Sequence, residues 1–229
     1  MKSLFSVSLL SVLVFGSACK MESDKKNSSS KDSQENTTVT TGNFVDSCED
    51  ENTSPAFKNT MNAIKDTVGE EDCSLLWEEL KTTTRLQMWG DELEDLTPIG
   101  MITSLKELSL WENNITDIRP LSKLTSLRKL VLDSNRIRDV RPLGNLPELV
   151  SLDLSHNQVE DVQALGDISS LKYLYLTGNE IEDASPIANL DGLVRLHLYS
   201  NPIIEDRRSC PVGRQVPAPL NDYCSNLVD

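Results

Sequence analysis

Two histidines, five cysteines and a regular series of aspartates are the residues of this chain whose types could support chemistry. His156 and His197 lie outside any pattern of a nucleophile elbow or a glycine-rich phosphate loop. The aspartates recur every 22 residues, so their carboxylates could form a column of oxygens of the kind that calcium uses. The members of this series are Asp95, Asp117, Asp139, Asp161 and Asp183. Their spacing requires that the element that positions them is itself repeated.

The middle of the chain consists of repeats of 22 residues. A unit with a degraded start occupies residues 83–104, and a last unit breaks off within 193–204. We therefore expect about six repeats over residues 83–204. The four complete units between them are 105–126, which reads LKELSLWENNITDIRPLSKLTS, then 127–148, 149–170 and 171–192.

Each unit has the pattern of a short strand followed by a turn. In the second unit Leu108 and Leu110 point to one side of a strand, and the residue between them points to the other side. An Asn or Asp follows three residues after the second leucine, where a short polar side chain can satisfy backbone groups of its own and the neighbouring turn. Stacked units of this kind predict a solenoid with a curved parallel sheet on its concave face and irregular or 3-10 turns on its convex face.

The pattern LxxLxLxxNxIxDIxPLxxLxx resembles the leucine-rich repeat, and in particular the internalin-type repeat of bacteria. The resemblance covers about 120 residues and implies a domain that binds proteins. The expected fold class is therefore an α/β solenoid, with a helical cap at its N-terminal end and a disulfide-closed cap at its C-terminal end.

The repeat register changes the interpretation of the histidines and aspartates. His156 and His197 fall two repeats apart, roughly 10 Å at the usual strand spacing, which is too far for shared ligation of one metal ion. Arg138 and Arg141 lie beside the aspartate column, and hydrogen bonds to the N–H groups of the next turn explain these carboxylates better than calcium does. We expect no catalysis, no metal and no cofactor.

The first residues of the chain predict export. Lys2 precedes an apolar stretch that is too short to span a bilayer core of roughly 30 Å, and small residues then precede Cys19. Small residues followed by Cys resemble the bacterial lipobox, which implies removal of residues 1–18 and a lipid on Cys19, although Gly16 stands where that motif usually has a large apolar residue. The expected location is the outer membrane, on either of its faces. The alternative is an ordinary signal peptide, cleaved after Ala18.

Residues 19–41, which are rich in Ser, Asn, Lys and Asp, predict a disordered tether. A helical N-terminal cap is expected over 42–82, with Ser54-Pro55 and Asp72 beginning two helices. The apolar faces of these helices should cover the first repeat. They consist of Phe57, Met61, Ile64 and Val68 in the first helix and of Cys73, Leu76, Trp77 and Leu80 in the second.

Four cysteines remain after export, and outside the reducing cytosol they predict two disulfides. We favour the pairs Cys48–Cys73 and Cys210–Cys224 among three pairings, because each pair brackets one end of the repeats. The second pair would close a C-terminal cap over 205–229. Four free, buried thiols are the alternative.

The strand residues that are not leucine point out of the concave face and include five of the seven tryptophans and tyrosines of the chain. Exposed aromatic side chains are enriched as binding anchors, and we expect Trp89 and Trp111 to form a flat apolar shelf. The alternative is a set of cross-strand ladders that only stabilise the sheet. The predicted partner site comprises Arg85, Trp89, Glu107, Trp111, Asp133, Asp153, Tyr173, Tyr175, His197 and Tyr199.

The charge of the chain limits its partners. The formal net charge of −14 disfavours nucleic acid and anionic surfaces, and the sequence suggests no compensating stripe of Lys and Arg. We expect a monomer that binds a protein and contacts the membrane only through its lipid anchor. A glycan partner, or a structural envelope role without a focused partner, is the alternative.

Overall fold

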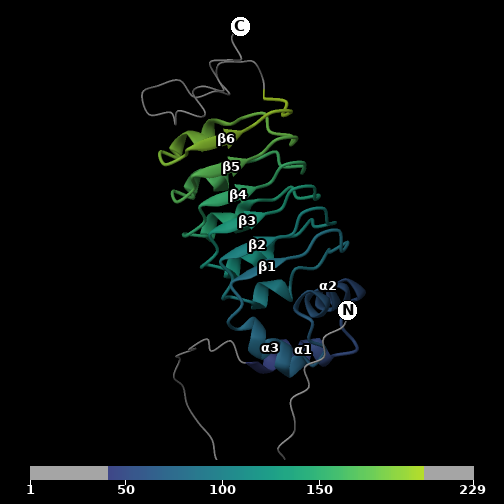
Figure 1. Ribbon diagram of the computed structural model, residues 1–229. Helices are drawn as coiled ribbons and strands as arrows, with labels where there is room; N and C mark the ends of the chain where they lie inside the picture. The colour runs from purple at the N-terminus through teal and green to yellow at the C-terminus, as the bar shows by residue number, and fades with distance from the viewer. Residues whose placement is uncertain (1–40, 204–229) are drawn as a thin grey trace, which may run out of the picture. The chain divides into compact units, whose positions relative to one another are not determined.

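The computed structural model of the chain describes residues 41–203. Its repeats form one sheet of six parallel strands that follow each other in chain order (Figure 1). Each strand pairs in register with the strand 22 residues later, so that Leu86 lies beside Leu108. The strands are β1 (Arg85–Gln87), β2 (Glu107–Ser109), β3 (Lys129–Val131), β4 (Ser151–Asp153), β5 (Tyr173–Tyr175) and β6 (Arg195–His197).

A 3-10 turn follows each of the first five strands, and consecutive turns contact one another. Proline stands at the first or second position of three of these turns, where its missing N–H is not needed. The predicted parallel sheet and 3-10 turns are confirmed. The turns are η1 (Ile99–Met101), η2 (Arg119–Lys123), η3 (Arg141–Asn145), η4 (Gln163–Asp167) and η5 (Ser185–Asn189).

The apolar positions of the repeats form one continuous core. In the second unit Leu108, Leu110, Ile115 and Leu121 are all 1% exposed or less, and the equivalent positions of the other units are buried as well. The strand residues between the buried leucines are exposed or half-buried, so the sheet has an outer face that points away from this core. This outer face is the predicted concave face.

Asparagine side chains link each repeat to its neighbours by hydrogen bonds to the backbone. The Asn113 amide donates to the carbonyl of Leu110 at 3.1 Å, and its Oδ1 accepts from the N–H of Leu93 at 3.1 Å. Asn135 makes equivalent bonds to Leu132 and Ile115. Because these backbone groups are buried and lie beyond the strand ladder, the amides satisfy donors and acceptors that would otherwise have no partner. The predicted structural role of these residues is confirmed.

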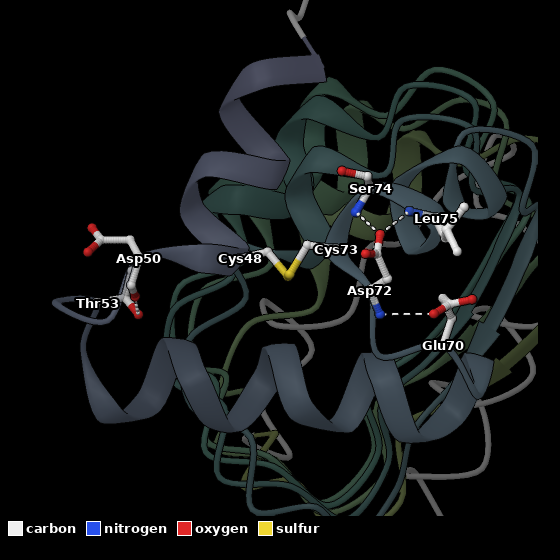
Figure 2. Close-up of a disulfide and its surroundings, with 8 residues drawn as sticks. All are labelled: Cys48, Asp50, Thr53, Glu70, Asp72, Cys73, Ser74 and Leu75. Carbon is white, nitrogen blue, oxygen red and sulfur yellow. Dashed lines mark hydrogen bonds between the residues drawn. A yellow bond between two sulfur atoms is a disulfide. The ribbon is translucent and has the colours of Figure 1, made fainter. Parts of the chain in front are cut away.

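Three helices precede the sheet: α1 (Thr41–Glu49), α2 (Pro55–Val68) and α3 (Cys73–Leu80). The Ser54 hydroxyl caps α2 by accepting from the N–H of Phe57, and Gly69 ends it in the left-handed region at φ 84°. Figure 2 shows the corresponding cap of α3, where one Asp72 oxygen accepts from the N–H groups of Ser74 and Leu75 at 2.9 Å. Both caps were predicted.

The helices cover the first repeat as expected. The Thr60 hydroxyl donates to the carbonyl of Asp95 at 2.7 Å, which attaches α2 to the first unit. Trp77 is 6% exposed and its ring stacks on Phe44 with the ring centroids 4.7 Å apart. Trp77 is therefore a core residue, as predicted.

Helix α1 is an additional element that the sequence analysis did not predict. It brings Cys48 to Cys73 at the start of α3, and these residues form a disulfide (Figure 2). The predicted first pairing is thus confirmed. Several predictions lie outside the described residues. They are the lipid on Cys19, the second pair Cys210–Cys224, the C-terminal cap, and the tether except for its last residue, Thr41. Within residues 41–203, no helix combines the length and the apolar composition needed to cross a bilayer.

Candidate functional site

Two tryptophans stack on each other on the outer face of the sheet. Trp89 follows β1 and Trp111 follows β2, and their ring centroids lie 5.1 Å apart with an angle of 14° between the ring planes. Trp89 is 59% exposed, whereas Trp111 is half-buried. The register predicted that Trp111 lies on this face, one strand from Trp89, and the stack agrees with that prediction.

The geometry of the indoles corrects the expectation of a flat shelf. Near-parallel rings at this distance form an offset stack, so each indole covers part of one face of the other. Trp89 consequently offers more accessible surface than Trp111. A partner that uses this cluster gains most of its apolar contact from Trp89.

The predicted charged neighbours of the tryptophans form an ion pair. Arg85 donates from Nε and from a terminal nitrogen to the two carboxylate oxygens of Glu107, at 2.9 and 3.0 Å. These hydrogen bonds lower the pKa of Glu107 and raise the pKa of Arg85. Because both side chains are largely exposed, the pair contributes little to stability, and its effect is to hold the two charges in one orientation.

A small hollow lies next to this ion pair on the outer face. Its volume is about 50 Å³, which is room for a few water molecules or one carboxylate group. Ser109 and Val131 are smaller than the side chains around them and therefore leave this space in the sheet surface. The lining residues are Arg85, Leu86, Gln87, Glu107, Leu108, Ser109, Lys129 and Val131.

A second group of rings lies over β5 and β6. Tyr175 meets His197 edge to face with the ring centroids 4.9 Å apart, and His197 lies 6.1 Å from Tyr199. Tyr199 is 63% exposed and Tyr173 is 37% exposed. The His197 ring therefore lies between the rings of Tyr175 and Tyr199 and contacts both.

The polar middle of the face contains a residue that the sequence analysis left out of the site. The Nδ1 of His156 lies 2.8 Å from Oδ1 of Asp133, and the Ser134 hydroxyl donates to the other oxygen of that carboxylate. Asp153, the other predicted acid, accepts from the N–H of Ser155 at 3.0 Å. Both predicted acids thus lie at the centre of the outer face with part of their hydrogen-bonding capacity already used.

His156 reaches Asp133 because of an unusual backbone conformation. Its φ is 53°, in the left-handed region, and Gly178 at the same position of the next repeat has φ 69°. A Cβ on Gly178 would lie 2.9 Å from Cδ2 of His156, so the glycine leaves the space that the imidazole occupies. The sequence contains only a weak signal for this conformation, because glycine stands at the same repeat position in Gly90 and Gly178 whereas Glu112, Ser134 and Ser200 do not favour positive φ.

The aspartate column has a structural role. Each member accepts from the N–H two residues later, at 2.8 to 3.0 Å, which is the local hydrogen bonding that was predicted. Arg141 also donates to both oxygens of Asp139 and lowers the pKa of that carboxyl to about 2. In the described part of the chain, no group of three or more His, Cys, Asp or Glu residues could hold a metal ion.

One edge of the sheet carries several exposed cations, a clustering that the sequence pattern did not reveal. The carbonyl of Lys106 accepts from the N–H groups of Arg128 and Lys129, and the carbonyl of Lys172 accepts from the N–H of Arg195. Val150 stands between Arg128 and Lys172 in this stack, so the cations form two groups, one beside β2 and β3 and one beside β5 and β6. All five side chains are exposed. We define the basic edge as Lys106, Arg128, Lys129, Lys172 and Arg195.

None of the basic-edge side chains forms an ion pair with a residue of the 41–203 segment. Other arginines of the repeats do find such partners, as Arg119 does with Asp117 and Arg141 does with Asp139. The basic edge is therefore a local exception in a chain whose formal net charge is −14.

The fold of the described residues is a leucine-rich repeat solenoid. The family description "Leucine Rich repeats (2 copies)" matches residues 103–143, and "Leucine rich repeat" matches residues 125–181. Proteins of this class typically serve as non-enzymatic scaffolds that bind other proteins. No curated protein sequence matches the chain significantly.

Solved structures of bacterial leucine-rich repeat proteins resemble the chain. An internalin (inlF) from Listeria monocytogenes is 35% identical over 55% of this chain, with a TM-score of 0.53. A leucine-rich repeat protein of Leptospira interrogans is 26% identical over 67% of this chain, also with a TM-score of 0.53. The similar region spans only 37% of the length of each of these two proteins.

Proposed function

We propose that the protein is an exported, lipid-anchored binding module that recognises a protein partner through the outer face of its sheet. Catalysis is not part of this proposal. The N-terminal segment with Cys19 supports export and anchoring by its resemblance to a bacterial lipoprotein signal. The leucine-rich repeat class supports protein binding, since such scaffolds commonly bind proteins.

The exposed aromatic clusters are the observation that carries the proposal. Trp89 is 59% exposed and Tyr199 is 63% exposed, although the repeat could place polar side chains at both positions. Large exposed aromatic side chains lose little conformational entropy on binding and bury much area, which makes them frequent hot spots of interfaces. The outer face holds one such cluster over β1 and β2 and another over β5 and β6.

The polar residues between the clusters suit an interface. Asp133 and Asp153 can accept further hydrogen bonds, and the Arg85–Glu107 pair is held in a fixed orientation. Interfaces combine apolar anchors with polar groups that set the register of the partner. We therefore expect the partner to span the face from β1 to β6.

Site-specific photo-crosslinking in the cells that make the protein tests this proposal. The crosslinking amino acid p-benzoylphenylalanine replaces Gln87, which is exposed on the outer face, or Gln163, which is exposed at the start of η4. We expect an adduct with a defined protein from position 87 and none from position 163. The same adduct should become weaker when Trp89 is replaced by alanine.

Two results would contradict the proposal. Identical adducts from both positions would mean that the partner does not select the outer face, and an adduct from position 87 that ignores Trp89→Ala would mean that the aromatic stack takes no part. Adducts that contain only sugar would favour the alternative of a glycan-binding surface, because aromatic rings also stack on sugar faces.

A further inference from the structure

The basic edge contains five exposed cations without an ion-pair partner among residues 41–203. It borders the outer face of the sheet, because Lys129 begins β3 and Arg195 begins β6 on that face. A partner that covers the outer face therefore comes close to these charges. In a chain with a formal net charge of −14, five cations gather along one edge in two groups, one beside β2 and β3 and one beside β5 and β6. Such a concentration of one charge favours an oppositely charged ligand at this edge.

We propose that the basic edge binds an acidic peptide segment of the protein partner and that the hollow beside Lys129 receives one of its carboxylates. This inference rests on the proposed function, because it describes the chemistry of the partner of the outer face. The acidic segment runs across the strands, along the row of cations, and does not extend the sheet.

The length of the row sets the length of the segment. The cations extend from the strand level of β2 to that of β6, which is four strand spacings or about 19 Å. An extended peptide rises about 3.3 Å per residue, so about six residues cover this distance, and its alternate side chains face the same side. A segment of six to eight residues that is rich in Asp and Glu can therefore place several carboxylates opposite the row.

The hollow can hold a carboxylate group. Its volume of about 50 Å³ matches one carboxylate group. Lys129 supplies a positive charge at its rim, the Ser109 hydroxyl and the Gln87 amide supply hydrogen-bond donors, and Arg85 neutralises the charge of Glu107. A single acidic side chain can thus enter the hollow and replace water with charged and polar contacts.

Binding of a defined acidic peptide tests the inference. The probe is a fluorescent octaglutamate amide, compared with an octaglutamine amide, at low salt. The variants are the triple change Lys106→Gln, Arg128→Gln and Lys172→Gln, and the single change Lys129→Gln. A triple change with the same loss of charge is the matched control, and it alters exposed cations outside the basic edge, namely Lys123→Gln, Arg136→Gln and Arg138→Gln.

We expect octaglutamate to bind and octaglutamine not to bind. Each exposed ion pair contributes about two- to fivefold to affinity. The triple change of the basic edge should therefore weaken octaglutamate binding at least about tenfold, and Lys129→Gln should weaken it about two- to fivefold. The control triple should weaken octaglutamate binding by less than about twofold. Added salt should weaken binding because the groups are exposed.

Several outcomes would overturn the inference. One is the absence of octaglutamate binding, including the case in which phosphatidylglycerol vesicles or dextran sulfate bind the basic edge instead. Another is an equal loss of octaglutamate affinity in the two triple variants. The variant Trp89→Ala should bind octaglutamate normally. Loss of the crosslinked partner in that variant then reports on the outer face alone, so that failure of the proposed function and failure of this inference can be told apart.

Discussion

At the residue scale, the two tryptophans differ in exposure and should differ in function. Because the indoles stack, Trp89 presents a free face, whereas Trp111 is half-buried and supports it. We expect Trp89→Ala to weaken binding of the partner by about 2 kcal/mol or more, as for an aromatic hot spot. Trp111→Ala should weaken binding as well, because Trp89 loses the ring that orients it. Titration of the purified variants with the crosslinked partner measures both effects.

Stability provides the control for this prediction. Neither tryptophan change opens a cavity in the core. Each should cost about 0.5–1.5 kcal/mol for the lost stacking, and Trp111→Ala a little more because this residue is half-buried. Leu110→Ala, in the core beneath the same face, should cost roughly 2–5 kcal/mol in the free energy of unfolding. If Trp111→Ala destabilises the protein like Leu110→Ala and the folded fraction still binds normally, the indoles belong to the scaffold and form the cross-strand ladder of the alternative interpretation.

The ion pair of Asp139 and Arg141 leads to a prediction about pH. Because Arg141 lowers the pKa of Asp139 to about 2, the folded state favours the charged carboxylate. The pair therefore stabilises the fold above the ordinary carboxyl pKa of about 3.9, and this contribution is lost as the pH falls toward 2. We expect Arg141→Ala to raise the pKa of Asp139 toward its ordinary value in an NMR titration of the carboxyl carbon.

Arg138→Ala is the matched control for the titration, because the Arg138 side chain donates to Gln158 and is not among the groups that lower the pKa of Asp139. The pKa of Asp139 should stay low in this variant. A pKa near 2 in the Arg141→Ala variant would show that another group holds the carboxylate in its charged form.

At the scale of the elements, the space beside a glycine of one 3-10 turn depends on the residue that faces it in the next turn. A Cβ on Gly166 would lie 2.3 Å from the carbonyl oxygen of Pro186, whereas a Cβ on Gly144 would lie 3.4 Å from that of Ala164. We expect Gly166→Ala to lower the free energy of unfolding by about 1–3 kcal/mol through overpacking, and Gly144→Ala to change it by less than about 0.5 kcal/mol. Urea denaturation of the two variants measures the difference. Equal stabilities would mean that the turns shift apart without cost.

The disulfide between α1 and α3 should stabilise the N-terminal cap. It joins residues that are 25 apart in the sequence, and the loop-entropy estimate for such a closure is about 3 kcal/mol. Replacing both Cys48 and Cys73 by alanine should therefore lower the free energy of unfolding by about that amount. Hydrogen exchange should increase first in residues 41–49, because the disulfide and the Phe44–Trp77 stack attach this helix.

The repeats should remain protected in the disulfide variant, since their hydrogen bonds and core do not involve the two cysteines. Unchanged exchange in residues 41–49 would show that α1 is held by its apolar contacts alone.

At the scale of the whole molecule, attachment to the membrane depends on one residue in the proposal. Cys19→Ala should yield a product without lipid, because a diacylglyceryl group on this residue is the attachment that we propose. The variant should move from the detergent phase to the aqueous phase in a partitioning assay. Equal partitioning of the variant and the parent would exclude Cys19 as the anchor. A change of Asn36 to Ala in the same segment serves as the control and should not alter partitioning.

The fold was predictable from the sequence because its signals are local and repeated. The 22-residue period places leucine at the same position of every turn, and stacking is the arrangement that buries these residues. The caps of α2 and α3 were predictable for the same reason, since Ser54 and Asp72 bond to N–H groups two or three residues away. Helix α1 was missed, although Phe44 and Cys48 stand one helical turn apart on what became its buried side.

Only the tertiary structure decided how side chains from different repeats meet. The repeat register predicted that Trp89 and Trp111 are neighbours. Whether the two indoles lie side by side on the sheet or stack on each other depends on their side-chain rotamers, and each ring limits the rotamers of the other. His156 reaches Asp133 through a left-handed backbone and the absent side chain of Gly178, which are contacts between residues 22 or 23 apart. The basic edge forms for a related reason, since parallel stacking aligns cations that stand just before and at the start of different strands and that look scattered along the chain.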